Sequence, residues 1–148
     1  MYLVSACLAG INCRYDGKNT KIAEIEELVK DGKAISICPE VIAGLNTPRD
    51  SCEIVITDDG TKKVISKDNK DFTLAYRDGA QKTLNIAKII GINTAILKAK
   101  SPSCGCGQVY DGKFSGNLIN GNGITAELLL INNIKIYTEE NFKEIYPF

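Results

Sequence analysis

The chain contains no histidine and no tryptophan, and its 148 residues include only one methionine. The lack of histidine removes the commonest general base and metal ligand of proteins. It also excludes mechanisms in which histidine activates a serine or cysteine nucleophile. A metal in this protein must therefore be held by cysteine or carboxylate side chains.

An excess of charge of either sign is also lacking, because 18 Lys and Arg residues balance 18 Asp and Glu residues. No overall field therefore recruits nucleic acid or an anionic membrane surface. No apolar run approaches the length of a membrane span, and the residues before Cys7 lack the basic leader of a signal peptide. We expect a cytoplasmic protein with neither nucleic acid nor membrane as partner, and its oligomeric state stays open.

The phosphate-binding motifs of common cofactors are missing as well. Gly105 and Gly107 begin a pattern like that of dinucleotide-binding loops, but Tyr110 occupies the position of the third glycine. No Walker lysine motif occurs either. The sequence therefore does not require a nicotinamide, a flavin or a nucleoside triphosphate.

What is present is an alternation of short apolar runs and amphipathic stretches, within a length that suits a single domain over residues 1–148. Strands are expected at residues 3–6, 34–37, 94–97 and 134–137, and helices at 22–29, 71–91, 125–131 and 139–145. Residues 52–57 and 62–65 flank an Asp-Gly turn and predict a β-hairpin. The predicted fold class is α/β, a mainly parallel sheet of about four strands with helices on both faces, plus an inserted β-hairpin.

Six cysteines are many for a chain that we expect inside the cell. Cys7 directly follows the first expected strand, Cys38 follows the second, and Cys104 lies shortly after the third. Because parallel strands end at the same edge of a sheet, these three thiols are predicted to meet in one crevice, where ligands of such sheets bind.

The loop that carries Cys104 follows the third strand without a regular pattern. Pro102 removes a backbone donor, and Gly105 and Gly107 permit backbone angles that side chains disfavour. Alone, this loop with Cys104 and Cys106 suggests a paired-thiol redox site. Its expected position at the edge of a parallel sheet instead places Cys104 near Cys7 and Cys38, which are distant in the sequence.

An iron–sulfur cluster fits three converging cysteines better than structural zinc does. Structural zinc usually takes two close pairs of ligands, whereas this chain has one close pair, Cys104 and Cys106. A cubane cluster accepts dispersed cysteines. With three protein ligands, one iron keeps an open position at which chemistry occurs.

Three motifs, spread over nearly the whole chain, make it resemble domain-of-unknown-function family 523. They are Ser5–Gly10 with Cys13–Gly17, Cys38–Glu40 with Thr47–Arg49, and Lys98–Gly105. Characterised members of that family are thiouracil desulfidases. The resemblance implies an enzyme that removes sulfur hydrolytically, without net redox, from 2-thiouracil or a similar small thiocarbonyl compound.

The resemblance also implies roles for individual residues. Cys7, Cys38 and Cys104 would ligate a [4Fe-4S] cluster whose open iron binds the substrate sulfur. Glu40 would be the catalytic acid/base, and Ser101, in preference to Ser103, would orient substrate or water. Three cysteines stay outside this set, namely Cys13, Cys52 and Cys106.

A non-enzymatic alternative remains from the residues themselves. Cys104 and Cys106 could serve a metal or thiol module, such as a sulfur carrier or a redox sensor. Cys52, at the start of an expected strand, is more typical of a core residue than of a ligand.

Overall fold

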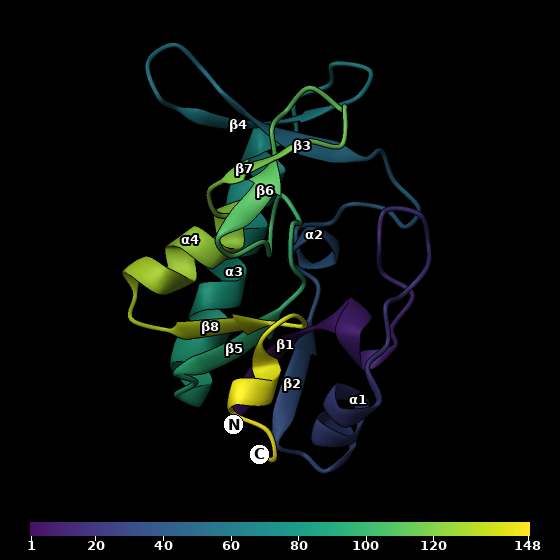
Figure 1. Cartoon of the computed structure of the whole chain (residues 1–148), viewed down its shortest axis with the longest axis vertical. Helices are drawn as coiled ribbons and strands as arrows, with labels where there is room; N and C mark the ends of the chain where they lie inside the picture. The colour runs from purple at the N-terminus through teal and green to yellow at the C-terminus, as the bar shows by residue number, and fades with distance from the viewer.

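The centre of the molecule is a four-stranded parallel sheet. A computed structural model describes all 148 residues, and the strand order is β2-β1-β5-β8 (Figure 1). The strands are β1 Tyr2–Ser5, β2 Ala34–Ile37, β5 Thr94–Leu97 and β8 Lys135–Thr138. All three pairings are parallel, so the strands end at one common edge. The predicted fold class is confirmed.

Helices cover both faces of this sheet. They are α1 Ala23–Lys30, α2 Pro39–Ile42, α3 Thr73–Ile90 and α4 Ile124–Ile131, with two 3₁₀ turns at Ala6–Ala9 and Phe142–Glu144. One hydrophobic cluster joins one face of the sheet to α3 and α4, and a second joins the other face to α1 and both 3₁₀ turns.

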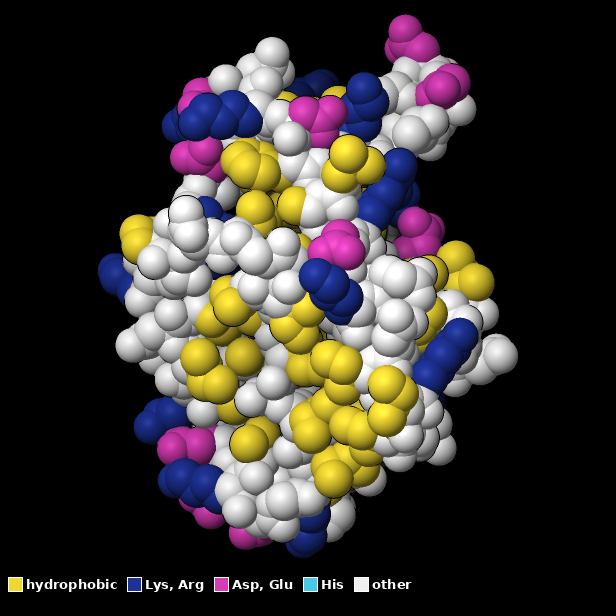
Figure 2. Space-filling model, turned by 180° about the vertical axis from the view of Figure 1, so that it is seen from behind, with side chains coloured by type: hydrophobic (Ala, Val, Ile, Leu, Met, Phe, Trp, Pro, Cys, Tyr) yellow, Lys and Arg dark blue, Asp and Glu magenta, His cyan; other side chains and the backbone are white.

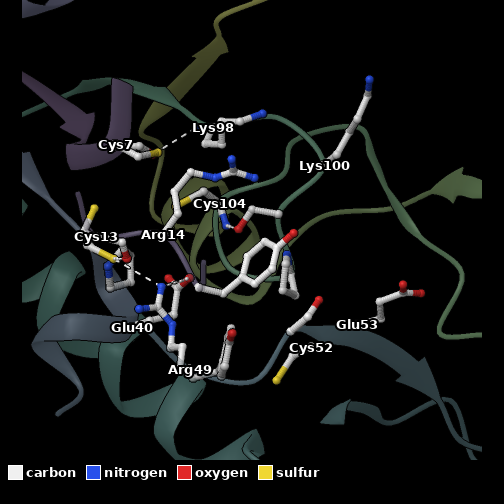
Figure 3. A pocket seen from close by; sticks show the side chains of 18 of the residues that line it. Cys7, Cys13, Arg14, Glu40, Arg49, Cys52, Glu53, Lys98, Lys100 and Cys104 are labelled. Carbon is white, nitrogen blue, oxygen red and sulfur yellow. Dashed lines mark hydrogen bonds and ion pairs between the residues drawn. The ribbon is translucent and has the colours of Figure 1, made fainter. Parts of the chain in front are cut away.

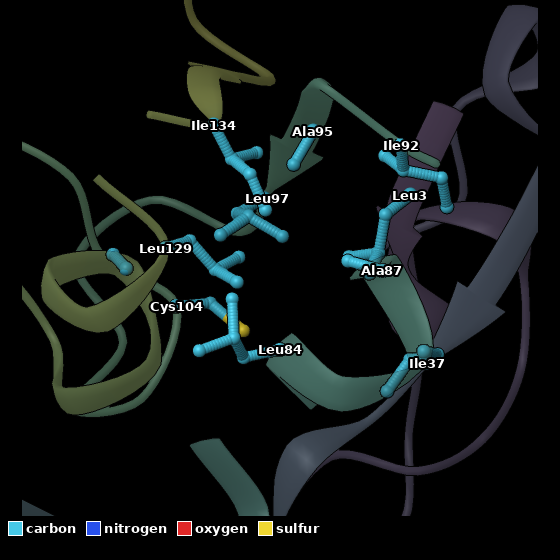
Figure 4. Packing of buried hydrophobic residues seen from close by; sticks show 11 residues of the cluster. Leu3, Ile37, Leu84, Ala87, Ile92, Ala95, Leu97, Cys104, Leu129 and Ile134 are labelled. Atoms are coloured by element: carbon cyan, nitrogen blue, oxygen red, sulfur yellow. The ribbon is translucent and has the colours of Figure 1, made fainter. Parts of the chain in front are cut away.

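The two-residue period of a strand decides which residue enters which cluster. In β1, Leu3 packs with α3 and α4, as Figure 4 shows, while its neighbour Val4 packs with α1. Ala95 and Leu97 of β5 belong to the same cluster as Leu3, and Ile96 between them belongs to the cluster that contains Val4. Both faces are buried, which explains why the strands read as continuous apolar runs.

Two antiparallel hairpins stand beyond the carboxyl edge of the sheet (Figure 1). The first joins β3 Cys52–Ile56 to β4 Lys62–Ser66, as predicted. The second joins β6 Gln108–Tyr110 to β7 Leu118–Asn120. The sequence did not predict it, because its strands have three residues each and lie in a glycine-rich stretch.

A close approach of two helices brings Cys38 and its neighbours into place. Gly79 in α3 packs on the start of α2, where a Cβ atom on Gly79 would lie 2.2 Å from the Pro39 carbonyl oxygen. No side chain fits there. Glycine in the middle of a helix lowers stability by about 1 kcal/mol relative to alanine, but this contact between α2 and α3 requires it.

One local expectation was wrong. The closing helix at 139–145 is only the 3₁₀ turn Phe142–Glu144. Helix α1 has Ile22 at its N-cap, without a side-chain hydrogen bond. Before the helix, Thr20 donates its backbone N–H to the Cys7 carbonyl, 3.0 Å away, and so holds the end of the loop that follows β1.

The surface carries scattered apolar side chains. Seen from behind in Figure 2, hydrophobic side chains gather in the lower half of the molecule. The most exposed large ones in the chain are Leu74, Ile89 and Ile131. None of the helices combines the length and the apolar composition that crossing a membrane requires.

Candidate metal centre

A cavity of about 510 Å³ lies between the carboxyl edge of the sheet and the two hairpins. The segments after β1, β2 and β5 form one wall, and residues from β3 and from the β6–β7 hairpin form the other. Figure 3 shows Cys7, Cys13 and Cys104 on one side of it and Cys52 and Glu53 on the other. The lining includes five Lys or Arg residues and two Glu residues. The cavity is thus locally basic in a chain of zero net charge, which favours an anionic occupant.

The structure brings all three predicted ligands to this cavity. Cys7 lies in the 3₁₀ turn after β1, Cys38 is the residue before α2, and Cys104 lies in the turn after β5. All three thiols are free. The topology explains the convergence, because three neighbouring parallel strands deliver their following residues to one edge.

The donor set fits a cluster better than a single ion. No three Cys, Asp or Glu side chains lie close enough to hold one metal ion. Thiolates of a cubane bind separate irons and so stand further apart. Only three buried side-chain nitrogen or oxygen atoms in the chain lack a hydrogen-bond partner, namely Thr20 Oγ1, Glu40 Oε1 and Arg49 Nε. Glu40 and Arg49 line the cavity, and Thr20 lies beside Cys7, so all three unsatisfied atoms lie at the cavity or beside one of its cysteines, where a bound group would supply partners.

Burial dominates the proton affinity of two of the thiols. It raises the pKa of Cys104 well above its usual value, with the nearby Glu40 carboxylate as the next cause. Burial also raises the pKa of Cys7. For Cys38 the balance is reversed, because a hydrogen bond from the Cys13 thiol lowers its pKa. Iron bound at these thiols would displace their protons.

Glu40 is held by a buried ion pair at the start of α2. Its Oε2 atom lies 3.3 Å from Nη2 of Arg49, and the two side chains are 12% and 9% exposed. Arg49 is itself fixed, because its backbone N–H donates to the Tyr15 carbonyl at 2.8 Å and its Nη1 donates to Thr47 Oγ1 at 3.2 Å. The other oxygen of Glu40, Oε1, has no partner and is available for proton transfer.

Ser101 and Ser103 have different surroundings. The Ser101 Oγ atom accepts the backbone N–H groups of Ser103 and Cys104 at 3.1 and 3.0 Å, and Ser101 lines the cavity. Ser103 is fully buried and shares a 2.8 Å hydrogen bond with Thr125. The geometry therefore supports the preference for Ser101.

The loop around Cys104 is fixed by close backbone packing. Gly107 has the positive φ that was expected, 88°. Gly105 does not have a positive φ, so the expectation that its backbone angle requires glycine was wrong. A Cβ on Gly105 would lie 2.6 Å from the Ser101 carbonyl oxygen, so this glycine is needed for space. Gly123, before α4, likewise leaves no room, since its Cβ would lie 2.4 Å from the Ser103 carbonyl oxygen.

The remaining cysteines separate into three environments. Cys13 lines the cavity, and its carbonyl lies 3.7 Å from the Cys38 sulfur. Its place beside a predicted ligand could not be read from the sequence, because it depends on how the loop folds back. Cys52 is buried in the opposite wall, where its thiol donates to the Asp50 carbonyl at 3.7 Å and burial raises its pKa to about 11. Cys106 does not line the cavity and packs against the cluster of α3 and α4.

Sequence motifs did not predict the aromatic part of the lining. Tyr15, Tyr110 and Phe114 line the cavity, the last two from the β6–β7 hairpin. Among the cations, Lys98 forms a 2.6 Å ion pair with Glu139, whereas Lys100 has no ion-pair partner. These side chains surround the space in front of the three cysteines.

Comparison with known proteins identifies the family of this chain. A family model described as 2-thiouracil desulfurase matches residues 2–141. The uncharacterized protein YbbK of Bacillus subtilis strain 168 is 43% identical, over 98% of this chain and 99% of that protein. The solved structure of the [4Fe-4S]-dependent thiouracil desulfidase TudS is 36% identical, with a TM-score of 0.88 over 97% of this chain and 93% of that one. The resemblance seen in the three motifs is confirmed, and the chain belongs to the 2-thiouracil desulfurase family.

Proposed function

We propose that this protein is a desulfidase that converts 2-thiouracil, or a similar small thiocarbonyl compound, to the oxygen analogue and hydrogen sulfide. The observation that carries the proposal is the meeting of Cys7, Cys38 and Cys104 at one basic cavity, in a fold shared with a [4Fe-4S]-dependent thiouracil desulfidase. A single domain over residues 1–148 carries all of these residues. All six cysteines are free, which supports a cytoplasmic location, where thiols usually stay reduced.

The cofactor is a [4Fe-4S] cluster held by Cys7, Cys38 and Cys104. When bound, it supplies an electrophilic iron that takes the substrate sulfur and makes this sulfur a better leaving group. The reaction is a hydrolysis, in which the ring carbon gains the oxygen of water and sulfur leaves as hydrogen sulfide. No electron is consumed, in agreement with the absence of nicotinamide and flavin motifs.

Glu40 is the acid/base of this reaction. Its Oε1 atom is buried and unpaired, while Arg49 holds Oε2, so one oxygen is fixed and the other is free to take a proton from water. The same oxygen then returns the proton to the departing sulfur. The ion pair also limits rotation of the carboxylate, which keeps Oε1 aimed at one place.

Ser101 orients the substrate or the attacking water. Its Oγ atom already accepts two backbone N–H groups, so its own proton is free to be donated into the cavity. The aromatic side chains of Tyr15, Tyr110 and Phe114 offer apolar surface to a flat ring. Arg14 and Lys100 supply donors for carbonyl oxygens on that ring.

The thiol-module alternative finds no support in the geometry. Cys104 is buried, Cys106 packs against the core, and burial raises the pKa of both thiols. Redox-active cysteines instead have lowered pKa values and exposed sulfur.

The test is anaerobic reconstitution with iron and sulfide, followed by a sulfide-release assay on 2-thiouracil and its relatives. We expect a brown protein with about four irons per chain and equal amounts of uracil and sulfide. A chain that binds stoichiometric zinc and no iron, or a full cluster without sulfide release from any thiopyrimidine, would contradict the proposal.

A further inference from the structure

Each of the three predicted ligands has a side-chain donor of its own. The first pair is Cys7 and Thr20. The Thr20 hydroxyl is buried without a hydrogen-bond partner and lies beside the Cys7 thiol. The backbone bond from Thr20 N–H to the Cys7 carbonyl, at 3.0 Å, holds the two residues together. A buried hydroxyl without an acceptor is costly, and a thiolate at Cys7 would satisfy it.

The second pair is Cys38 and Arg49. Nη2 of Arg49 lies 3.9 Å from the Cys38 sulfur and 3.3 Å from Glu40. The guanidinium thus stands between a predicted ligand and the predicted acid/base. The backbone N–H of Val41 in α2 is a second donor to the same sulfur.

The third pair is Cys104 and Ser5, both of which are buried. The Ser5 Oγ atom accepts the backbone N–H of Lys98 at 2.9 Å. The hydroxyl proton is therefore free, and it faces the Cys104 sulfur. Ser5 is the last residue of β1, next to β5 in the sheet, so the sheet register fixes this contact.

We propose that Thr20, Arg49 and Ser5 are positioning residues whose side chains donate hydrogen bonds to the thiolates of Cys7, Cys38 and Cys104, one side chain to each thiolate. This inference rests on the proposed function, because it needs the cluster. Hydrogen bonds to ligand sulfurs withdraw charge from the thiolates, so they raise the reduction potential of the cluster. The same withdrawal leaves the iron that takes the substrate sulfur more electrophilic.

Thr20 offers the clearest test, since it neither lines the cavity nor belongs to the catalytic residues. Thr20→Val keeps the shape of the side chain and removes the donor, and Thr20→Ser keeps the donor. Both are reconstituted anaerobically and titrated with dithionite while the reduced cluster is followed by electron paramagnetic resonance. We expect the same iron content in all three proteins, a lower midpoint potential in Thr20→Val, and a potential near that of the unsubstituted protein in Thr20→Ser.

An unchanged potential in Thr20→Val, with a full cluster, would overturn this inference and leave the proposed function standing. If the unsubstituted protein takes up no cluster, the proposed function itself fails, and this inference falls with it. Should Thr20→Val not fold, as judged by circular dichroism, Ser5→Ala makes the same test at Cys104, with the same expected direction and the same contradicting result.

Discussion

The two walls of the cavity are built on different principles. The sheet wall consists of residues that directly follow β1, β2 and β5, and it carries the chemical groups, namely Cys7, Cys38, Glu40, Ser101 and Cys104. The hairpin wall consists of short antiparallel pieces, and it carries mostly shape and apolar surface. Backbone pairing of neighbouring strands positions the first wall, whereas a few side-chain contacts position the second.

One carboxylate shows how the hairpin wall is held. Glu53 of β3 is buried, and its Oε1 atom accepts the backbone N–H groups of Gly112 and Phe114 at 3.0 and 3.2 Å. Gly112 packs so closely on β3 that a Cβ atom there would lie 2.6 Å from the Ile54 carbonyl oxygen. The loop between β6 and β7 is thus attached to β3, which brings Phe114 to the cavity. The predicted ligand and catalytic residues thus lie on the wall that the sheet positions, and the aromatic surface opposite them lies on the wall that Glu53 and Gly112 hold in place.

Replacing a cysteine of the sheet wall should cause the greatest loss, and a cysteine of the hairpin wall serves as its control. Cys7→Ala, Cys38→Ala and Cys104→Ala should each prevent a stable cubane, because two thiolates remain to hold it. The matched control is Cys52→Ala in the hairpin wall, which should keep full iron and sulfide content. Iron and sulfide counts per chain after anaerobic reconstitution measure this, and a complete cluster in any sheet-wall variant would remove that cysteine from the ligand set.

Glu40→Gln should leave the cluster intact and lower turnover by about 10²–10⁴-fold, the usual contribution of a general acid/base. The amide still accepts a hydrogen bond from Arg49 but takes no proton from water. Initial rates of sulfide release from 2-thiouracil give the result, with the exposed Glu27→Gln of α1 as control. Turnover at the unsubstituted rate would show that Glu40 is not the acid/base.

On the hairpin wall, Glu53→Ala should act on substrate binding and stability instead. It leaves two backbone donors without an acceptor, at a cost of about 1–3 kcal/mol for each donor that stays buried. We expect a lower urea midpoint and a raised KM with a smaller change in kcat, because the loop that carries Phe114 loosens. The urea midpoint and the KM of Glu53→Gln, which keeps one acceptor oxygen, should lie between those of Glu53→Ala and of the unsubstituted protein. An effect on kcat as large as that of Glu40→Gln would contradict the division between the walls.

The smallest effect is expected for Cys106→Ala, which lies on neither wall. Cluster content and sulfide release should be retained, with a change in unfolding free energy of at most about 1 kcal/mol. Loss of activity with a full cluster would revive the dithiol interpretation of the Cys104 loop. Visible absorption and the sulfide assay, on the same preparation, distinguish the cluster mechanism from the dithiol mechanism.

The sheet wall could be predicted from the sequence for a physical reason. Strands buried on both faces leave continuous apolar runs, and the residue that follows each run must lie at the edge. Cys7 and Cys38 were placed in this way. In the hairpin wall only the β3–β4 hairpin was predicted, from its Asp-Gly turn. The β6–β7 part left no such signal, because its strands are short and Glu53 binds backbone N–H groups far along the chain. The same holds for Thr20 and Cys13, whose neighbours depend on loop folding.

The wide spacing of the three cysteines along the chain has a further consequence for how the protein matures. Only the completed sheet brings Cys7, Cys38 and Cys104 together, so the apoprotein must fold before it is loaded. A cluster on the three proposed ligands would connect three loops that are far apart in sequence, and such a connection restricts the unfolded chain more than a local one does. On that ligand set the cofactor would act as a cross-link inserted after folding, and its loss would loosen the three loops at the carboxyl edge together.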